Sequence, residues 1–236
     1  MSLDVNFGRF KLFKFKLKLV IDIGAQVGLF SKNLNSLYPD CKFILFEPNA
    51  ECNPYLEKTK FEYYNWLLYK KPDVNVKFYL NKDDPISTGN SIYLEQTDHF
   101  DQASYKIIRT KILDQFNLKE SVDLIKLDVQ GAELDVLKGA KNILKKTRFV
   151  LIETSLKNYN LDAPLESEIV KYMTKIGFKN YILFDQHIWN SEENKKIGLK
   201  KGELFQNDLL FISNRCNKSE LIRFKLLNSY INIKRH

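Results

Sequence analysis

Four acidic residues lie at or near the ends of short apolar segments. Glu47, Asp128 and Glu153 each close such a segment, and Asp22 comes one residue before the end of the first. Continuous apolar runs are typical of parallel strands that are buried on both faces. Because the carboxyl ends of parallel strands meet at one rim of a sheet, we expect the four carboxylates to lie together. Like charges in one place cost folding energy, so this crowding indicates a ligand with hydroxyl groups or positive charge.

The turn after the first apolar segment limits what that ligand is. Gly24 and Gly28 bracket this turn and let the backbone pass close to a ligand. No Gly-Lys-Ser/Thr follows, which excludes a P-loop, and Gln26 stands where a dinucleotide-binding turn needs glycine. Glu47 is placed to accept two ribose hydroxyls, and Asp22 disfavours an anionic pyrophosphate. An adenosine-bearing cation without phosphates fits both acids, and we expect S-adenosylmethionine as the cofactor.

Strands and helices must alternate to bring these acids together, and the apolar pattern predicts that they do. This order predicts a doubly wound, mostly parallel, Rossmann-like α/β sheet with helices on both faces. A final pair of strands joined by a polar loop predicts an antiparallel strand at the C-terminal edge. The predicted strands are 19–23, 42–47, 122–128, 148–152, 180–184 and 208–212, and the predicted helices are 29–37, 49–58, 132–146 and 166–176.

The pattern is weaker between the second predicted helix and residue 122. Asp, Pro, Gly and Asn gather in one segment of this region, 81–91, which is long enough to be a functional loop. The other expected elements are short strands at 63–68, 74–80 and 105–110 and a short helix at 112–118.

The two ends of the chain are basic. Lysines alternate with Phe13, Phe15 and Leu17, which predicts that the lead-in 1–18 is extended with one apolar face. This segment either packs on the domain as it enters the first core strand or presents a basic, aromatic surface to anionic lipid or nucleic acid. The tail 214–236 is expected to be helical.

Composition bounds the class of protein. The chain has 236 residues, 44% of them hydrophobic and 28% charged, which fits one large folded domain. No apolar run is long enough to cross a bilayer, and no signal peptide is visible. Three widely spaced cysteines form neither a disulfide framework nor a zinc site, so we expect a cytoplasmic protein. The net charge of +8 reflects either a Lys-rich proteome or a partner rich in phosphate.

Several stretches resemble the FkbM-type methyltransferases, which are class I enzymes that use S-adenosylmethionine. The resemblance covers about residues 19–213, which we expect to form the methyltransferase domain. One departure is Gln26, where the family more often has Asn and where the side-chain amide is kept. The matching segments are 22–28 (DIGAQVG), 46–49 (FEPN), 124–140 (LIKLDVQGAELDVLKGA), 150–153 (VLIE) and 208–211 (DLLF).

The resemblance implies O-methylation of a hydroxyl on a sugar, glycan or secondary metabolite by in-line displacement at the sulfonium methyl. Asp128 is expected to position the reacting groups or to act as general base, and Glu153 is the alternative base. Ser91, Gln130 and Glu133 are the candidate substrate-binding residues. The candidate cofactor-binding residues are Asp22, Gly24, Ala25, Gln26, Gly28, Glu47, Pro48, Asn49, Asn65, Trp66, Asp128 and Val129.

Each candidate also has a structural interpretation. Trp66 could stack on adenine or serve as a core aromatic, and Glu133 could be an acid of a first helical turn. His99 and His187 are weak candidates for the base, because an isolated histidine is usually a surface residue. No cluster has metal-ligand spacing, so we expect no structural metal, with an oxygen-ligated magnesium at the acidic rim left open.

Two alternative functions remain. An RNA methyltransferase would explain the charge of +8, and the missing Asn/Asp-Pro-Pro-aromatic motif leaves ribose methylation as its form. A non-catalytic interaction module that kept the fold is the other alternative. The sequence does not identify the acceptor or the oligomeric state.

Overall fold

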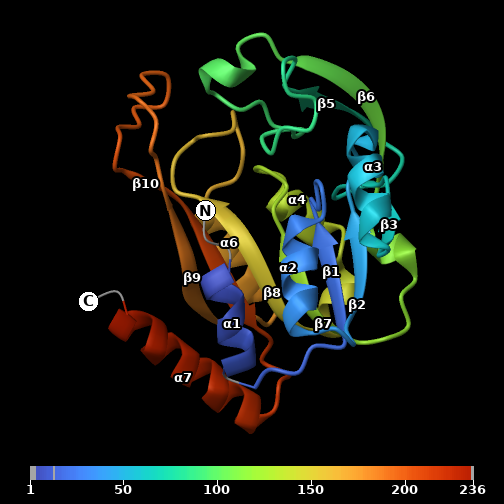
Figure 1. Ribbon diagram of the computed structural model, residues 1–236, viewed down its shortest axis with the longest axis vertical. Coiled ribbons are helices and arrows are strands. Elements are labelled where there is room, and N and C mark those ends of the chain that lie inside the picture. Colours follow the sequence, from blue (N-terminus) through green and yellow to red (C-terminus); the bar gives the residue numbers. More distant parts are fainter. Residues whose placement is uncertain (1–3, 13, 235–236) are drawn as a thin grey trace.

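The computed structural model describes residues 4–12 and 14–234 and is built around a seven-stranded sheet (Figure 1). The strand order is β3-β2-β1-β7-β8-β10-β9; β10 runs antiparallel to β8 and β9, and the other neighbouring pairs are parallel. The doubly wound, mostly parallel sheet and its antiparallel C-terminal edge are therefore as predicted. The strands are β1 (Leu19–Ile23), β2 (Lys42–Phe46), β3 (Glu62–Tyr64), β7 (Val122–Leu127), β8 (Thr147–Ser155), β9 (Asn180–Ile188) and β10 (Leu204–Ile212).

Helices cover both faces of this sheet. One face carries α1 (Asp4–Leu12), α2 (Leu29–Leu37), α3 (Asn53–Leu56) and α7 (Lys218–Lys234), and the other carries α4 (Glu133–Lys138), α5 (Lys141–Leu144) and α6 (Glu166–Lys175). Short 3₁₀ turns flank α3 at Ala50–Cys52 and Glu57–Thr59, and two more lie at Asp98–Phe100 and Leu113–Phe116. None of the described helices is both long and apolar enough to cross a membrane.

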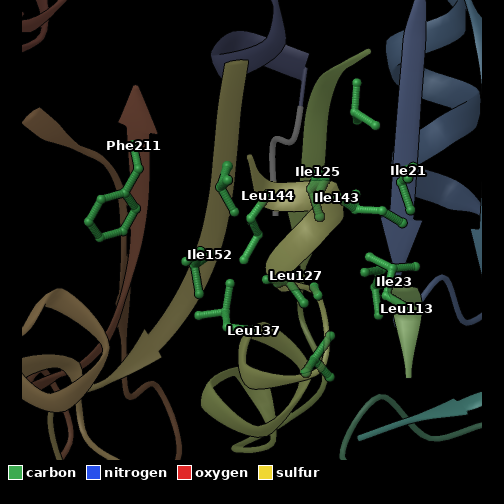
Figure 2. Packing of buried hydrophobic residues seen from close by; sticks show 14 of the residues in the cluster. Ile21, Ile23, Leu113, Ile125, Leu127, Leu137, Ile143, Leu144, Ile152 and Phe211 are labelled. Atoms are coloured by element: carbon green, nitrogen blue, oxygen red, sulfur yellow. The ribbon is translucent and has the colours of Figure 1, made fainter. Parts of the chain in front are cut away.

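The core shows why these apolar runs form central strands. Within β1, Ile21 and Ile23 pack into one core cluster while Val20 packs into the other, because successive strand residues point to opposite faces. Figure 2 shows Leu127 of β7 and Ile152 of β8 beside Leu137 of α4 and Leu144 of α5, with Ile23 of β1 beside Leu113 in the same core cluster. A strand buried on both faces needs an unbroken apolar sequence, which is the pattern observed.

The register of the parallel strands sets the position of the site. Ile23 of β1 pairs with Phe46 of β2 and with Leu127 of β7, and Leu127 pairs in turn with Ile152 of β8. The next residue along each strand is therefore at the same rim of the sheet. Those residues are Gly24, Glu47, Asp128 and Glu153.

A second, three-stranded sheet lies beyond the carboxyl ends of the main strands. Its order is β4-β6-β5, with β4 at Leu67–Leu68, β5 at Asn75–Leu80 and β6 at Ser104–Lys111. The sequence predicted strands in these places but not their separation into a sheet of their own. The loop 81–91 connects this sheet to the rim that holds the acids.

The sequence prediction for the start of the chain was wrong in part. Residues 14–18 do alternate, with Phe15 and Leu17 buried between exposed lysines, but residues 4–12 form helix α1 rather than an extended segment. Phe7 and Phe10, three residues apart, lie on one side of this helix and are both buried. Phe13, which the alternation included, lies outside the described residues.

The predicted helix 132–146 is broken into α4 and α5 at Gly139. A Cβ atom on this glycine would lie 2.1 Å from the carbonyl oxygen of Tyr69, so the chain passes too closely for a side chain. The helix predicted at 49–58 is likewise a short α3 between two 3₁₀ turns.

Candidate functional site

A cavity of about 280 Å³ lies at the carboxyl ends of the main strands. It is bounded by the turn after β1, the end of β2, the loop before and after Ser91 and the ends of β7 to β10. Phe7 of α1 also contributes to its wall, so the N-terminal helix is part of the site. Of the residues predicted from sequence, those lining the cavity are Gly24, Ala25, Gln26, Glu47, Pro48, Asn49, Trp66, Ser91, Asp128, Val129, Gln130 and Glu153.

Glu47 is held in a fixed orientation by two backbone amides. Its Oε2 accepts a hydrogen bond from the Gln26 amide at 2.8 Å, and its Oε1 accepts one from the Asn49 amide at 2.9 Å. The side chain is 7% exposed, and burial raises its pKa to about 7 despite the two donated hydrogen bonds. Each carboxylate oxygen keeps a further lone pair for a ligand hydroxyl.

The turn after β1 needs glycine at its first position. Gly24 has φ +76°, and a Cβ atom there would lie 1.8 Å from the carbonyl oxygen of Asp128. The β1 and β7 ends are also joined by the Asp128 amide, which donates to the Ile23 carbonyl at 3.1 Å. The two central strand ends are therefore in direct backbone contact at the switch in strand order, where ligands bind in such sheets.

The side chains of Gln26 and Asn49 hold the loop 81–91 over the cavity. Gln26 Nε2 donates to the Ile86 carbonyl, and Asn49 Nδ2 donates to the Pro85 carbonyl, both at 2.7 Å. The side-chain amides of Gln26 and Asn49 are thus hydrogen-bonded to the protein, and the predicted cofactor contacts of these two residues stay predictions. The positions line the cavity, and their backbone atoms support Glu47.

Ser91 fixes the other end of this loop. Its hydroxyl lies 2.9 Å from the Val129 carbonyl and 2.8 Å from the Gln130 carbonyl, to which it donates. The residue is 2% exposed and borders the cavity. The hydroxyl therefore positions the turn after β7.

Lys126 is a site residue that sequence reasoning missed. It lies inside β7, forms an ion pair with Asp128 at 3.1 Å and comes within 3.7 Å of Asp22. It also donates to the Gly24 carbonyl at 3.3 Å. Its side chain is 12% exposed. The signal was available, because Lys126 is the basic residue within an otherwise apolar strand end, and it neutralises part of the acidic rim.

Asp22 lies beneath the turn rather than in the cavity. It is fully buried and accepts a hydrogen bond from Ser31 at 2.7 Å. Burial raises its pKa, which the positive charge of Lys126 partly opposes. Asp22 is linked to the cavity through its ion pair with Lys126, which lines the cavity.

Gln130 joins the two candidate bases. Its Nε2 donates to Asp128 Oδ1 at 2.7 Å and to Glu153 Oε1 at 2.8 Å. Burial acts to raise the pKa of Asp128, but Lys126 and the Gln130 hydrogen bond hold it below its usual value. The pKa of Glu153 is well above its usual value, because it is buried and close to Asp128 and Asp208.

Glu133, Asn65 and Gly28 have supporting positions outside the cavity lining. Glu133 is 3% exposed and accepts hydrogen bonds from the Val129 and Gly131 amides, so its carboxylate supports the turn after β7. Asn65 donates to the Glu47 carbonyl at 2.9 Å. Gly28 precedes α2 with φ +75°. For Glu133, burial raises the pKa to about 7.

Trp66 lines the cavity from an aromatic cluster. Its ring centroid lies 5.7 Å from that of Phe46 and 5.9 Å from that of Phe116, and Lys111 Nζ lies 4.6 Å from it. The ring is therefore both a packed aromatic and part of the site wall, so the two sequence interpretations are compatible.

The acidic rim extends to a histidine that the sequence ranked low. His187 Nε2 lies 3.3 Å from Asp208 Oδ2 and 3.8 Å from Glu153 Oε2, and all three residues line the cavity. They come from β8, β9 and β10, so no local spacing could reveal the group. His99, by contrast, is exposed on the 3₁₀ turn Asp98–Phe100.

Comparisons with known proteins match the chain to a curated relative, to solved structures and to a family model. A segment of 36 residues is 61% identical to the 2-O-methyltransferase NoeI of Sinorhizobium fredii and covers 15% of each chain. The precorrin-6y C5,15-methyltransferase of Geobacter metallireducens aligns with a TM-score of 0.47 at 8% identity, over 89% of this chain and 86% of that one. The N-terminal domain of EvdMO1 with SAH bound aligns with a TM-score of 0.47 at 8% identity, over 91% of this chain and 82% of that one.

Residues 22–179, about two thirds of the chain, match the model of the methyltransferase FkbM domain. The matched residues include the glycine turn, Glu47, Lys126, Asp128 and Glu153, which border the cavity. The chain therefore belongs to the FkbM methyltransferase family and carries an S-adenosylmethionine-dependent methyltransferase domain.

Proposed function

We propose that the protein transfers the methyl group of S-adenosylmethionine to a hydroxyl of a sugar, glycan or secondary metabolite. The observation that carries this proposal is the single cavity at the aligned strand ends. One end has the oriented Glu47 carboxylate for a ribose, and the other has the polar groups of Asp128, Gln130 and Glu153 for an acceptor. The 2-O-methyltransferase activity named for the matched relative supports a hydroxyl acceptor.

The proposed reaction is an in-line displacement. The acceptor oxygen forms a bond to the methyl carbon as the bond from that carbon to sulfur breaks, and the electron pair of the broken bond stays on sulfur. The positive charge is lost in this step, and the hydroxyl proton passes to a carboxylate, for which we assign Asp128 or Glu153. The chain's task is to hold oxygen and methyl carbon about 3 Å apart and in line.

The charge at the acceptor end favours a neutral acceptor over RNA. Asp128, Asp185 and Asp208 all border the cavity there, and the basic side chains among the described lining residues are Lys126 and His187, each within 3.3 Å of one of these aspartates. A phosphate backbone needs cations along its path, and these carboxylates would repel it. The excess of lysine and arginine that gives the net charge of +8 therefore lies outside the proposed acceptor site.

The test has two stages. Calorimetric titration of S-adenosylmethionine should give one site per chain, and a panel of hydroxyl-bearing sugars and metabolites should then accept labelled methyl groups. Asp128→Asn and Glu153→Gln should both lower kcat, and S-adenosylmethionine binding measured on each variant separates a loss of proton transfer from a loss of the cofactor contact expected of Asp128. Binding of RNA that falls steeply with salt, together with methylated ribose, would instead establish the RNA function.

A further inference from the structure

The strand register brings two carboxylates face to face at the acceptor end of the cavity. Glu153 of β8 and Asp208 of β10 are directly opposite each other in the antiparallel pair. Asp208 is also paired with Asp185 of β9, and His187 lies two residues farther along β9, on the same face. Like charges directly opposite each other destabilise a sheet, so this arrangement calls for a positive group between them.

The three side chains converge on one point without completing hydrogen bonds to one another. One ligand atom from each of Glu153, His187 and Asp208 lies within 4.8 Å of the others. His187 Nε2 is fully buried, and although Asp208 Oδ2 is 3.3 Å away, the two are not aligned as a hydrogen bond. Atoms that bind a common ion at about 2.1 Å each are separated by about 3–4 Å and do not point at one another.

Two glutamines fix the orientation of one member of this group. Gln130 Nε2 and Gln206 Nε2 donate to Glu153 Oε1 at 2.8 and 2.9 Å. The other oxygen, Oε2, faces His187. Amide donors that orient a carboxylate while leaving one oxygen for a ligand are typical of the outer shell around a metal site.

We propose that Glu153, His187 and Asp208 bind a divalent first-row transition-metal ion at the acceptor end of the cavity. Two carboxylates and one imidazole suit Mn²⁺ or Zn²⁺ better than Mg²⁺, which prefers oxygen ligands alone. Three protein ligands leave coordination positions open, as in metal sites that bind substrate. Since the group borders the cavity, those positions are available to oxygens of the acceptor, and adjacent hydroxyl groups of a sugar would fit them.

The competing explanation is a protonated His187 that forms ion pairs with the two carboxylates. Both explanations neutralise the rim, but only one requires an ion. Ion binding itself is independent of the proposed function, whereas the contact to an acceptor rests on it. The experiment must therefore measure the ion directly and S-adenosylmethionine binding separately.

The test uses the whole 236-residue chain after treatment with a chelator. Titration with Mn²⁺, followed by electron paramagnetic resonance, and with Zn²⁺, followed by calorimetry, should show one ion per chain. His187→Ala and Asp208→Asn should each weaken binding at least tenfold, and His99→Ala should not, because that histidine is exposed and outside the cavity. Co²⁺ substituted at the site should give a visible spectrum that His187→Ala changes.

The outcomes separate the inference from the proposed function. If the wild-type protein binds S-adenosylmethionine but no stoichiometric ion, or if the two variants bind the ion as the wild type does, the metal site is refuted and the methyltransferase proposal stands. If S-adenosylmethionine fails to bind to the wild type, the proposed function fails whatever the metal result. Retained S-adenosylmethionine binding in Asp208→Asn would show that a loss of metal is not a loss of fold.

Discussion

The affinity for S-adenosylmethionine should depend on the ionisation of Glu47. This carboxylate is proposed to accept two ribose hydroxyls, which requires its charged form, and burial raises its pKa to about 7. About one tenth of the free protein carries the charge at pH 6 and about nine tenths at pH 8, so the measured Kd should be about tenfold weaker at pH 6. The affinity then decreases as the pH falls through the pKa that Glu47 has in the ligand-free protein.

The size of the mutational effect follows from the two hydrogen bonds that Glu47 is proposed to accept from the ribose hydroxyls. A hydrogen bond to a charged acceptor contributes about 1.5–3 kcal/mol, so Glu47→Ala should lose about 3–6 kcal/mol, which is roughly 100-fold or more in Kd. Glu47→Gln keeps one acceptor oxygen and should lose about half of that free energy. Its Kd should also stay constant between pH 6 and pH 8, apart from titration of the ligand itself, which affects the wild type equally.

Calorimetry at pH 6, 7 and 8 on the wild type and both variants measures these effects. Glu51→Gln is the matched control, since Glu51 is exposed and pairs with Lys106 on the surface. A wild-type Kd that does not change with pH, or a Glu47→Gln variant with the affinity and pH profile of the wild type, would refute the assignment of Glu47 to the ribose.

The ionisation of Glu47 should also change the free energy of unfolding of the ligand-free protein. A carboxyl whose pKa is raised on folding stabilises the protein most below its unfolded pKa, and this contribution is lost as the pH rises through about 7. The difference amounts to about 3 kcal/mol for a shift of this size. The Tm of the ligand-free wild type should therefore fall between pH 5 and pH 8 more than that of Glu47→Gln.

Three further predictions concern other parts of the site. Gly24→Ala should abolish S-adenosylmethionine binding and lower the Tm, because its Cβ would lie 1.8 Å from the Asp128 carbonyl oxygen; normal binding in calorimetry would contradict this. Lys126→Met should cost about 3–5 kcal/mol in urea unfolding at pH 8, because it leaves buried carboxylates without their cation; an unchanged midpoint would show that Lys126 is not needed there. In a Trp189→Phe background, where Trp66 is the remaining tryptophan, S-adenosylmethionine should change the fluorescence, and a constant spectrum would place the adenine elsewhere.

The central sheet was predictable because its signals are local. A strand buried on both faces appears in the sequence as a continuous apolar run, and several of these runs end in an acid or at a glycine turn. The positions of Glu47, Asp128 and Glu153 at one rim followed from the parallel order alone. The helix α1 was missed because the lysine alternation of residues 14–18 was extended over Phe7 and Phe10, whose spacing fits a helix.

The contacts between distant segments were not predictable in the same way. Gln26 and Asn49 were identified as site residues, but the structure alone shows their amides holding the loop 81–91. Lys126 stands out in the sequence as a basic residue at an apolar strand end, but its partners Asp22 and Asp128 are revealed only when the neighbouring strands are in register. Asp22 and Glu133 likewise have contacts beneath the turns that the sequence could not specify, while their predicted contacts to cofactor or substrate stay predictions.

The sequence by itself determined the succession of strands and helices along the chain, the glycine turn and the acids that follow several strands, because hydrophobic burial and backbone geometry act over a few neighbouring residues. Only the tertiary structure brought His187 to Glu153 and Asp208. These residues are brought together by hydrogen-bond register between β8, β10 and β9, and register depends on how whole strands pair rather than on any local spacing.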